Sequence, residues 1–194
     1  MALTFDAGAN ADAVPSILAT LRARGVPATF FLTGDFVSNF PSAARAIAAA
    51  GMRVGDHTIS HPYLTKLSDA AVLGEIKGAA SQIRAVTGAD PVPLFRFPYG
   101  DCDARTIRLA NQAGYVPVRW TVDTLGWEGT AGHISPAVVT SRVLAALRPG
   151  EIVLMHVGSN PDDHTTFDAA ALPTVIAELR ARGYGFVTLD ALTG

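Results

Sequence analysis

The sequence predicts an α/β fold, a barrel-like (β/α) arrangement of about seven parallel strands, fewer than the eight of a closed barrel. Short segments rich in β-branched and aromatic residues alternate with longer Ala/Leu/Arg segments of helical period, which is the pattern of βα units. Glycines also stand just past most of the expected helices, where a left-handed residue ends a helix. A doubly wound open sheet is the structural alternative.

The expected elements follow one another along the whole chain. We expect strands near residues 2–5, 28–32, 52–56, 94–97, 116–122, 152–156 and 186–189. We expect helices near residues 11–24, 42–50, 68–86, 103–113, 136–147 and 170–182. No linker or low-complexity stretch interrupts this alternation, so residues 1–194 are predicted to form a single domain.

Composition narrows the classes of partner. Fifteen Lys and Arg against seventeen Asp and Glu give a net charge of −2 without runs of like charge, which favours neither nucleic acid nor an anionic membrane. No apolar run reaches the roughly 18 residues of a membrane span, and no signal peptide is expected. The start on a strand suggests an excised catalytic domain, and the single Cys102 excludes an internal disulfide.

Five residues that can handle protons or metals each stand at the end of a different strand-like segment. They are Asp6, His57, Arg96, Asp123 and His156. In a parallel barrel the C-terminal ends of the strands converge on one face, where active sites are built. We therefore expect these residues to meet in one pocket, and an enzyme is the leading interpretation.

The strongest local signal is the pair His57 and His61. Residues four apart lie about one helical turn from each other, so both imidazoles could reach one ion. Zinc is the expected occupant of such a site, with cobalt or nickel chemically possible. The alternative is a pair of surface histidines, which is also the interpretation for His133 and His164 in their loops.

The other polar residues suit acid–base work. Asp6, at the tip of a buried strand, suits a general base, and Arg96 in its apolar segment needs a carboxylate partner such as Asp6. Asp123 is a candidate to orient the imidazole of His156. The alternatives are a turn residue for Asp6, a structural ion pair for Arg96 and a core histidine for His156.

Together these segments resemble the polysaccharide deacetylases, the carbohydrate esterase family with the NodB-type homology domain. Five family motifs are matched in order along nearly the whole chain. They are Thr4-Phe5-Asp6, His57 to Pro62, Arg96 to Gly100, Asp123 to Trp127, and Leu154-Met155-His156. The family fold is an incomplete (β/α) barrel, in agreement with the strand count above.

The resemblance implies metal-dependent hydrolysis of acetyl groups on sugars. Asp6 would deprotonate a metal-bound water, with His57 and His61 as metal ligands and Arg96 holding Asp6 ionised. The backbone N–H of Tyr99 would stabilise the oxyanion, and His156, oriented by Asp123, would protonate the leaving amine. Trp127 and Leu154 would form apolar walls against the sugar or the acetyl methyl group.

Two positions depart from the family pattern. Ala7 stands where the family usually has an Asp that is the third metal ligand, and catalytic zinc normally has three protein ligands. Gly126 stands directly before Trp127, where a second Asp is common. With Ala7, only two protein ligands are expected for the metal. With Gly126, Asp123 is the one family carboxylate left to orient His156.

The predicted function is a hydrolase that removes acetyl groups from a carbohydrate, with N-acetyl favoured over O-acetyl. The alternatives are a non-catalytic carbohydrate-binding protein with a decayed metal site, and a barrel hydrolase acting on other linear C–N bonds such as formamides. The expected partner is an acetylated carbohydrate, and a monomer is expected. The resemblance implies an extracellular or cell-envelope location, because the polymers lie there.

Overall fold

The computed structural model describes residues 1–193, so Gly194, the last residue of the expected domain, lies outside the described residues. The chain packs into two compact units. Unit 1 comprises Met1–Thr29 and Trp120–Gly194, and unit 2 comprises Phe30–Arg119.

The strands confirm the α/β class and the expected number of about seven. In chain order they are β1 (Ala2–Ala7), β2 (Thr29–Leu32), β3 (Arg53–Asp56), β4 (Leu94–Phe95), β5 (Val116–Pro117), β6 (Val122–Asp123) and β7 (Ile152–His156). The sheet order is β5-β4-β3-β2-β1-β7-β6. The pairs β1–β7, β6–β7, β3–β4 and β4–β5 are all parallel.

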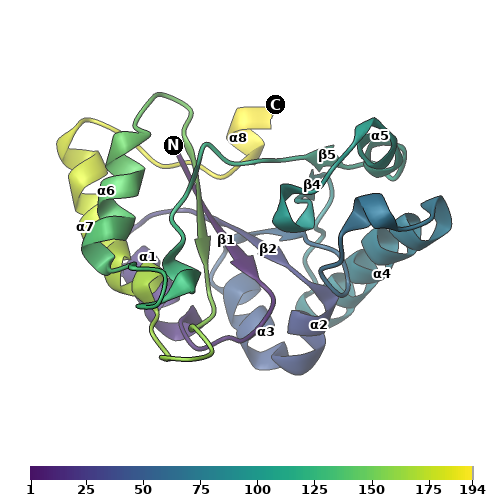
Figure 1. The fold of residues 1–194 in the computed structure, drawn as a ribbon, viewed down its shortest axis with the longest axis horizontal. Coiled ribbons are helices and arrows are strands. Elements are labelled where there is room, and N and C mark those ends of the chain that lie inside the picture. Colours follow the sequence, from purple (N-terminus) through teal and green to yellow (C-terminus); the bar gives the residue numbers. More distant parts are fainter. Residues whose placement is uncertain (194) are drawn as a thin grey trace. The chain divides into compact units, whose positions relative to one another are not determined.

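Unit 1 is built on the long parallel pair β1–β7. Its helices are α1 (Val14–Arg24), α6 (Pro136–Ala145), α7 (Phe167–Ala181), α8 (Asp190–Thr193) and the 3₁₀ turn η3 (Gly126–Glu128). Leu3 and Phe5 of β1 and Val153 and Met155 of β7 are completely buried, as expected for a parallel strand with both faces covered. Helices α6 and α7 lie side by side in this unit (Figure 1).

Unit 2 places its helices around β3, β4 and β5. They are α2 (Gly34–Asn39), α3 (Pro41–Ala49), α4 (Asp69–Thr87) and α5 (Ala104–Gln112), with 3₁₀ turns η1 (Leu64–Lys66) and η2 (Pro98–Gly100). Ile76 of α4 and Leu109 of α5 pack in one buried cluster with Phe95 and Tyr115.

Side-chain caps fix several helix starts. Ser68 accepts a hydrogen bond from the N–H of Ala71 at the start of α4, and Ser135 caps α6 in the same way. Asp103 and Thr106 form a reciprocal capping box at the start of α5. Such caps explain why the predicted helix starts at 68, 103 and 136 fall within one residue of the observed ones.

Two expected strands differ from the structure. The strand expected near 116–122 is two short strands, because β5 pairs with β4 whereas β6 pairs with β7. The prediction of a strand near 186–189 is wrong, because this segment forms no strand and ends in a turn. The Val187 N–H bonds to the Met1 carbonyl, but the Leu189 N–H bonds to the side chain of Thr29, so no regular ladder forms.

Candidate active site

In unit 1 the ends of three strands bring candidate residues together. Asp6 of β1 lies opposite His156 of β7 in the parallel register, and Asp123 of β6 lies opposite Leu154. Asp6 is 8% exposed, and the side chain of His156 is 25% exposed. The βα connectivity thus places two carboxylates and one imidazole at the carboxyl ends of neighbouring strands.

A third carboxylate, Asp168, contacts His156 directly. The backbone N–H of His156 donates to Asp168 Oδ2 at 2.8 Å, and His156 Nδ1 lies 3.7 Å from the same oxygen. Burial disfavours the charged imidazole, but contact with Asp168 and the charges of Asp6 and Asp123 outweigh it. The net effect raises the pKa of His156 above its ordinary value.

Asp123 has a different environment. Its Oδ1 accepts a hydrogen bond from the N–H of Leu125 at 2.9 Å, which ties the carboxylate to the turn that follows β6. Burial is the main reason that the pKa of Asp123 lies above its ordinary value. The negative charge of Asp123 also acts on His156. That Asp123 orients the imidazole remains a prediction.

Sequence reasoning missed Asp168. It lies in the first turn of α7, where an acidic residue is ordinarily explained by the helix dipole. The only further signal is its position at the start of a helix whose next residues are apolar. Its burial, with 3% exposure, and its contact with His156 depend on how α7 packs, which the sequence does not reveal.

The two residues expected as apolar walls differ in exposure. Trp127 is 48% exposed, and its ring centroid lies 6.2 Å from that of His156 in an edge-on arrangement. Leu154 is only 3% exposed, so most of its side chain belongs to the core. Trp127 therefore offers the larger apolar surface beside the imidazole.

In unit 2 the two histidines come together, but not through a helical turn. Their ring centroids are 4.7 Å apart, although residues 57–61 form no helix. Thr58 and His61 both have positive φ, at 69° and 59°, an uncommon conformation for residues with a side chain. The helical-turn explanation is wrong, while the expected proximity of the imidazoles is found.

This turn is held by several hydrogen bonds. Glu75 Oε2 accepts the N–H groups of Ile59 and Ser60, each at 2.9 Å. Asp56 Oδ1 accepts the N–H of Thr58 at 2.9 Å, and Thr58 Oγ1 accepts that of His61 at 3.1 Å. A strained backbone persists where its surroundings fix it in this way.

Asp56, directly before His57, is completely buried. Burial raises its pKa to about 7, although hydrogen bonds from Thr58 and from the Tyr115 hydroxyl, at 3.0 Å, act in the opposite direction. The carboxyl group links the histidine turn to the core of unit 2.

The histidines fit part of a metal site. His57 Nδ1 lies 2.8 Å from the Arg96 carbonyl, which can only accept, so Nδ1 carries the proton and Nε2 has the lone pair. Metal-ligating histidines commonly make such a second bond. However, no group of three His, Cys, Asp or Glu side chains suited to a metal occurs among residues 1–193. The donor set provides two protein ligands and does not complete three.

Arg96 and Tyr99 occupy contrasting positions. Arg96 is completely buried, with its guanidinium 4.1 Å from the centroid of the Phe31 ring and its Nε bonded to the Val118 carbonyl. Tyr99 has a φ of 57° within η2 and is 57% exposed. The expected pairing of Arg96 with Asp6 and the oxyanion role of the Tyr99 N–H remain predictions.

An exposed pair of aromatic rings lies beside His61. Tyr63 and Tyr99 are stacked, with centroids 4.2 Å apart and planes inclined by 13°. The His61 ring meets the Tyr99 ring edge-on at 4.5 Å, and Lys66 Nζ lies 4.4 Å from the centroid of the Tyr63 ring. The stack gives unit 2 an apolar surface next to the histidines.

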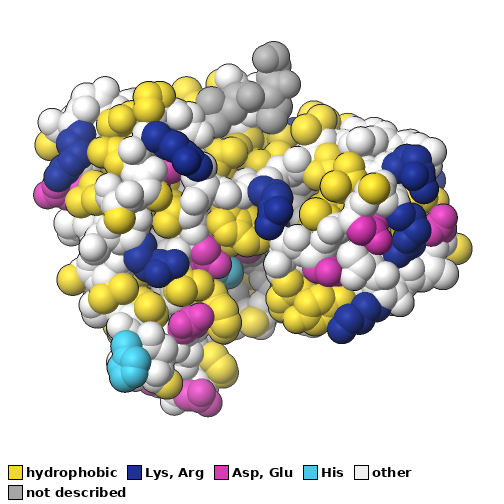
Figure 2. Space-filling view, turned by 45° about the horizontal axis from the view of Figure 1, so that its top comes forward, with side chains coloured by type: hydrophobic (Ala, Val, Ile, Leu, Met, Phe, Trp, Pro, Cys, Tyr) yellow, Lys and Arg dark blue, Asp and Glu magenta, His cyan; other side chains and the backbone are white. Residues whose placement is uncertain are grey.

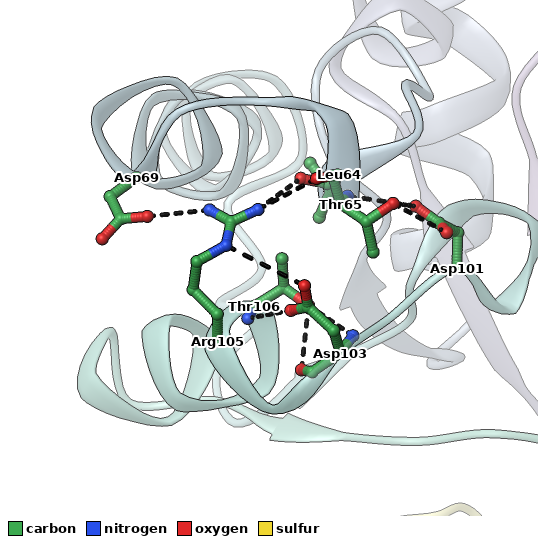
Figure 3. Close-up of polar contacts among 7 residues, drawn as sticks. All are labelled: Leu64, Thr65, Asp69, Asp101, Asp103, Arg105 and Thr106. Atoms are coloured by element: carbon green, nitrogen blue, oxygen red, sulfur yellow. Dashed lines mark hydrogen bonds and ion pairs between the residues drawn. The ribbon is translucent and has the colours of Figure 1, made fainter.

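A polar cluster fixes the loops that carry these residues (Figure 3). Asp101, two residues after Tyr99, accepts the backbone N–H and the hydroxyl of Thr65. Arg105 of α5 donates to Asp69 at 2.7 Å and to the Thr65 carbonyl at 3.1 Å. The loop after His61 and the turn of Tyr99 are therefore joined to each other and to two helices.

The comparisons with known proteins identify the family. A family model described as polysaccharide deacetylase matches residues 1–118. The peptidoglycan-N-acetylglucosamine deacetylase of Bacillus cereus is 34% identical over 192 residues, which cover 99% of this chain and 67% of that protein. The chitooligosaccharide deacetylase of Azorhizobium caulinodans is 33% identical, covering 96% of this chain and 91% of that protein. The chain belongs to the polysaccharide deacetylase family.

Solved structures similar to this chain include a pseudoenzyme. A family 4 carbohydrate esterase pseudoenzyme from Bacillus anthracis matches with a TM-score of 0.90 and 30% identity, covering all of this chain and 64% of that one. A mutant of that pseudoenzyme with restored enzymatic activity also matches with a TM-score of 0.90. The chain spans about two thirds of the length of these relatives, and only 39% of the Listeria monocytogenes peptidoglycan deacetylase that it also matches.

The helices and the surface charge bear on the kind of partner that the protein can bind. Among residues 1–193, no helix is both long and apolar enough to cross a membrane. The face drawn in Figure 2 carries Lys and Arg side chains singly, interspersed with acidic and apolar ones. This face thus presents mixed charges and no broad patch of one sign.

Proposed function

We propose that the protein is a hydrolase that removes N-acetyl groups from amino sugars in a polysaccharide or oligosaccharide. The observation that carries this proposal is the cluster of His156 with three carboxylates, in a chain that belongs to a deacetylase family. An imidazole with a raised pKa, held beside carboxylates, suits the protonation of a departing amine. The acetyl amide is accordingly favoured over the acetyl ester.

In the proposed reaction, Asp6 accepts one proton and His156 donates another. Asp6 takes a proton from the attacking water as the new C–O bond forms at the acetyl carbon. The family resemblance supports two further proposed roles: the backbone N–H of Tyr99 would stabilise the negative oxygen, and Arg96 would keep Asp6 ionised. The C–N bond then breaks as His156 gives its proton to the nitrogen, which leaves acetate and a free amine.

The remaining predicted residues bind and orient. Asp123 contributes negative charge near His156 and is proposed to help orient the imidazole. Trp127 provides an exposed apolar wall, to which the largely buried Leu154 adds little surface. The Tyr63–Tyr99 stack offers aromatic faces of the kind that pack against the C–H face of a sugar ring.

His57 and His61 are the proposed ligands of a divalent metal, with zinc the expected ion and cobalt or nickel the alternatives. When bound, such an ion polarises the acetyl carbonyl and acidifies the attacking water. The donor set and the proton on Nδ1 of His57 support the assignment. Ala7 leaves the site with two protein ligands, so we expect weaker binding than at a three-ligand site.

A non-catalytic carbohydrate-binding protein is the second candidate. The specific observation in its favour is the incomplete ligand set, together with the likeness to a pseudoenzyme. The carboxylates around His156 favour the enzyme, because binding a neutral glycan needs no imidazole with a raised pKa.

A panel of substrates tests the reaction class. The protein should release acetate from N-acetylglucosamine oligomers or peptidoglycan faster than from acetylated xylan, and should not release formate from simple formamides. Preferential hydrolysis of the formamides would instead establish the other linear C–N hydrolase. The peptidoglycan and chitooligosaccharide relatives support an extracellular or cell-envelope site of action, and we propose a monomer.

A further inference from the structure

We propose that Asp168 is the positioning residue of His156 and that Gly126 is required because it leaves room for the Asp168 carboxylate. The effect on catalysis rests on the proposed role of His156, whereas the effect on the imidazole itself does not. Both residues belong to unit 1, in which α7 and η3 pack together.

The Asp168 carboxylate is fixed on both oxygens. Thr124 Oγ1 lies 2.6 Å from Oδ1 of Asp168 and 3.0 Å from the carbonyl of Leu154. Oδ2 accepts the His156 backbone N–H at 2.8 Å and lies 3.7 Å from Nδ1. Because Asp168 is 3% exposed, water does little to screen its charge from the imidazole.

Gly126 has no space for a side chain while Asp168 is in place. A Cβ atom on Gly126 would lie 2.3 Å from Oδ1, 2.4 Å from Cγ and 2.7 Å from Oδ2 of Asp168. Such separations are far below van der Waals contact. The same geometry aims a side chain at position 126 into the volume that the carboxylate now fills, so a carboxylate from either position would reach His156.

The charges of three carboxylates act on His156, and the three come from different elements. Asp6 comes from β1, Asp123 from β6 and Asp168 from α7. The Asp123 oxygen is tied to the N–H of Leu125, and Arg142 of α6 donates to the Asp123 backbone carbonyl. Asp168 Oδ2 lies 3.7 Å from Nδ1 of the ring, and we infer that this carboxylate both orients the imidazole and stabilises its protonated form.

The direct test is an NMR titration of His156 in the wild type, Asp168→Asn and Asp123→Asn. Asparagine fits the site, because its oxygen can accept the His156 N–H while its amide donates to Thr124, whose proton can go to the Leu154 carbonyl. We expect Asp168→Asn to lower the His156 pKa more than Asp123→Asn does. An unchanged pKa, or a larger shift in Asp123→Asn, would overturn the proposal whether or not the protein is an enzyme.

If His156 is the acid, Asp168→Asn should also lower kcat by roughly 10²–10⁴-fold, with little change in KM. A kcat that stays at the wild-type value in an active enzyme would show that Asp168 has no positioning role. A protein that is inactive in every form, but shows the NMR shift, would instead count against the proposed function alone.

Exchanging the two positions tests the role of Gly126. Gly126→Asp alone should lower the thermal midpoint, because the new side chain meets the buried carboxylate. Combined with Asp168→Gly, it should restore both the midpoint and the raised His156 pKa toward the wild type. A single Gly126→Asp variant as stable as the wild type, or a double variant no better than Asp168→Gly, would contradict the shared position.

Discussion

At the scale of single residues, His156 determines how the protein should respond to pH. As the proposed general acid, His156 must be protonated, so the rate should fall as the pH rises through its pKa, which lies above the ordinary 6.5. The protonated form also stabilises the folded state at low pH, a contribution lost as the pH rises through that folded-state pKa. Profiles of kcat against pH should show an alkaline limb with a midpoint above 6.5. A limb centred below that value would contradict the assignment.

Tyr63 should affect substrate binding more than chemistry. Tyr63→Ala removes one of the two stacked rings, and aromatic contacts of this kind contribute about 0.5–1.5 kcal/mol. We expect KM for N-acetylglucosamine oligomers to rise roughly 3- to 10-fold with kcat nearly unchanged. Tyr63→Phe keeps the ring and is the matched control. A fall in kcat at constant KM would remove the stack from substrate binding.

Some residues around His156 could be predicted from the sequence, and others could not. The strand tips predicted the positions of Asp6, Asp123 and His156, because chain direction alone brings parallel strand ends to one edge. Asp168 could not be predicted, since its contact with His156 depends on the packing of α7. Gly126 departs from the family pattern in the sequence alone, but its closeness to Asp168 depends on how the chain packs in three dimensions.

At the scale of elements, the histidine turn depends on α4 for its shape. Glu75 bonds two backbone N–H groups of this turn, so Glu75→Ala should disturb the geometry of His57 and His61. Loss of such a supporting contact typically weakens metal binding by 10- to 100-fold, and we expect a loss of about 10-fold in zinc affinity by calorimetry. Glu75→Gln retains an acceptor and should lose less. Equal affinity in all three proteins would show that the turn holds its shape without Glu75.

The cluster of Arg105 should matter for the stability of unit 2. Arg105→Ala removes an ion pair and the hydrogen bonds to the Leu64 and Thr65 carbonyls, so we expect a loss of about 1–2 kcal/mol in the free energy of unfolding. Arg84→Ala is the control, because its ion pair with Asp90 is exposed and should contribute less than about 1 kcal/mol. Urea titrations measure both. A larger loss in Arg84→Ala would mean that the loop contacts of Arg105 do not stabilise the unit.

Helices whose ends are marked by local sequence features were predicted more accurately than strands, which depend on pairing with distant parts of the chain. Caps and helix-ending glycines placed the long helices within a few residues of their observed bounds. The two errors concern strands, because strand formation depends on pairing between distant segments. Residues 116–122 form two short strands that pair with β4 and β7, and residues 186–189 form no ladder. The short helix α2 was missed, since its six residues are too few to show a helical period.

At the scale of the whole molecule, unit 1 carries His156 in contact with Asp168, and unit 2 carries the adjacent imidazoles of His57 and His61. The family resemblance of the sequence extends over nearly the entire chain, and the comparisons confirm it. Neither composition nor the fold selects the polymer, because substrate choice in α/β barrels depends on loops rather than on the barrel strands.

The most direct measurement is acetate release from N-acetylglucosamine oligomers by metal-stripped protein, with and without added zinc. The wild type should release acetate when zinc is present, His57→Ala should lose the zinc response, and His156→Ala should lose turnover while remaining folded. Acetate release by His156→Ala at the wild-type rate would remove that residue from the mechanism. Glycan binding without any acetate release, at saturating zinc, would instead establish a carbohydrate-binding protein on a deacetylase scaffold.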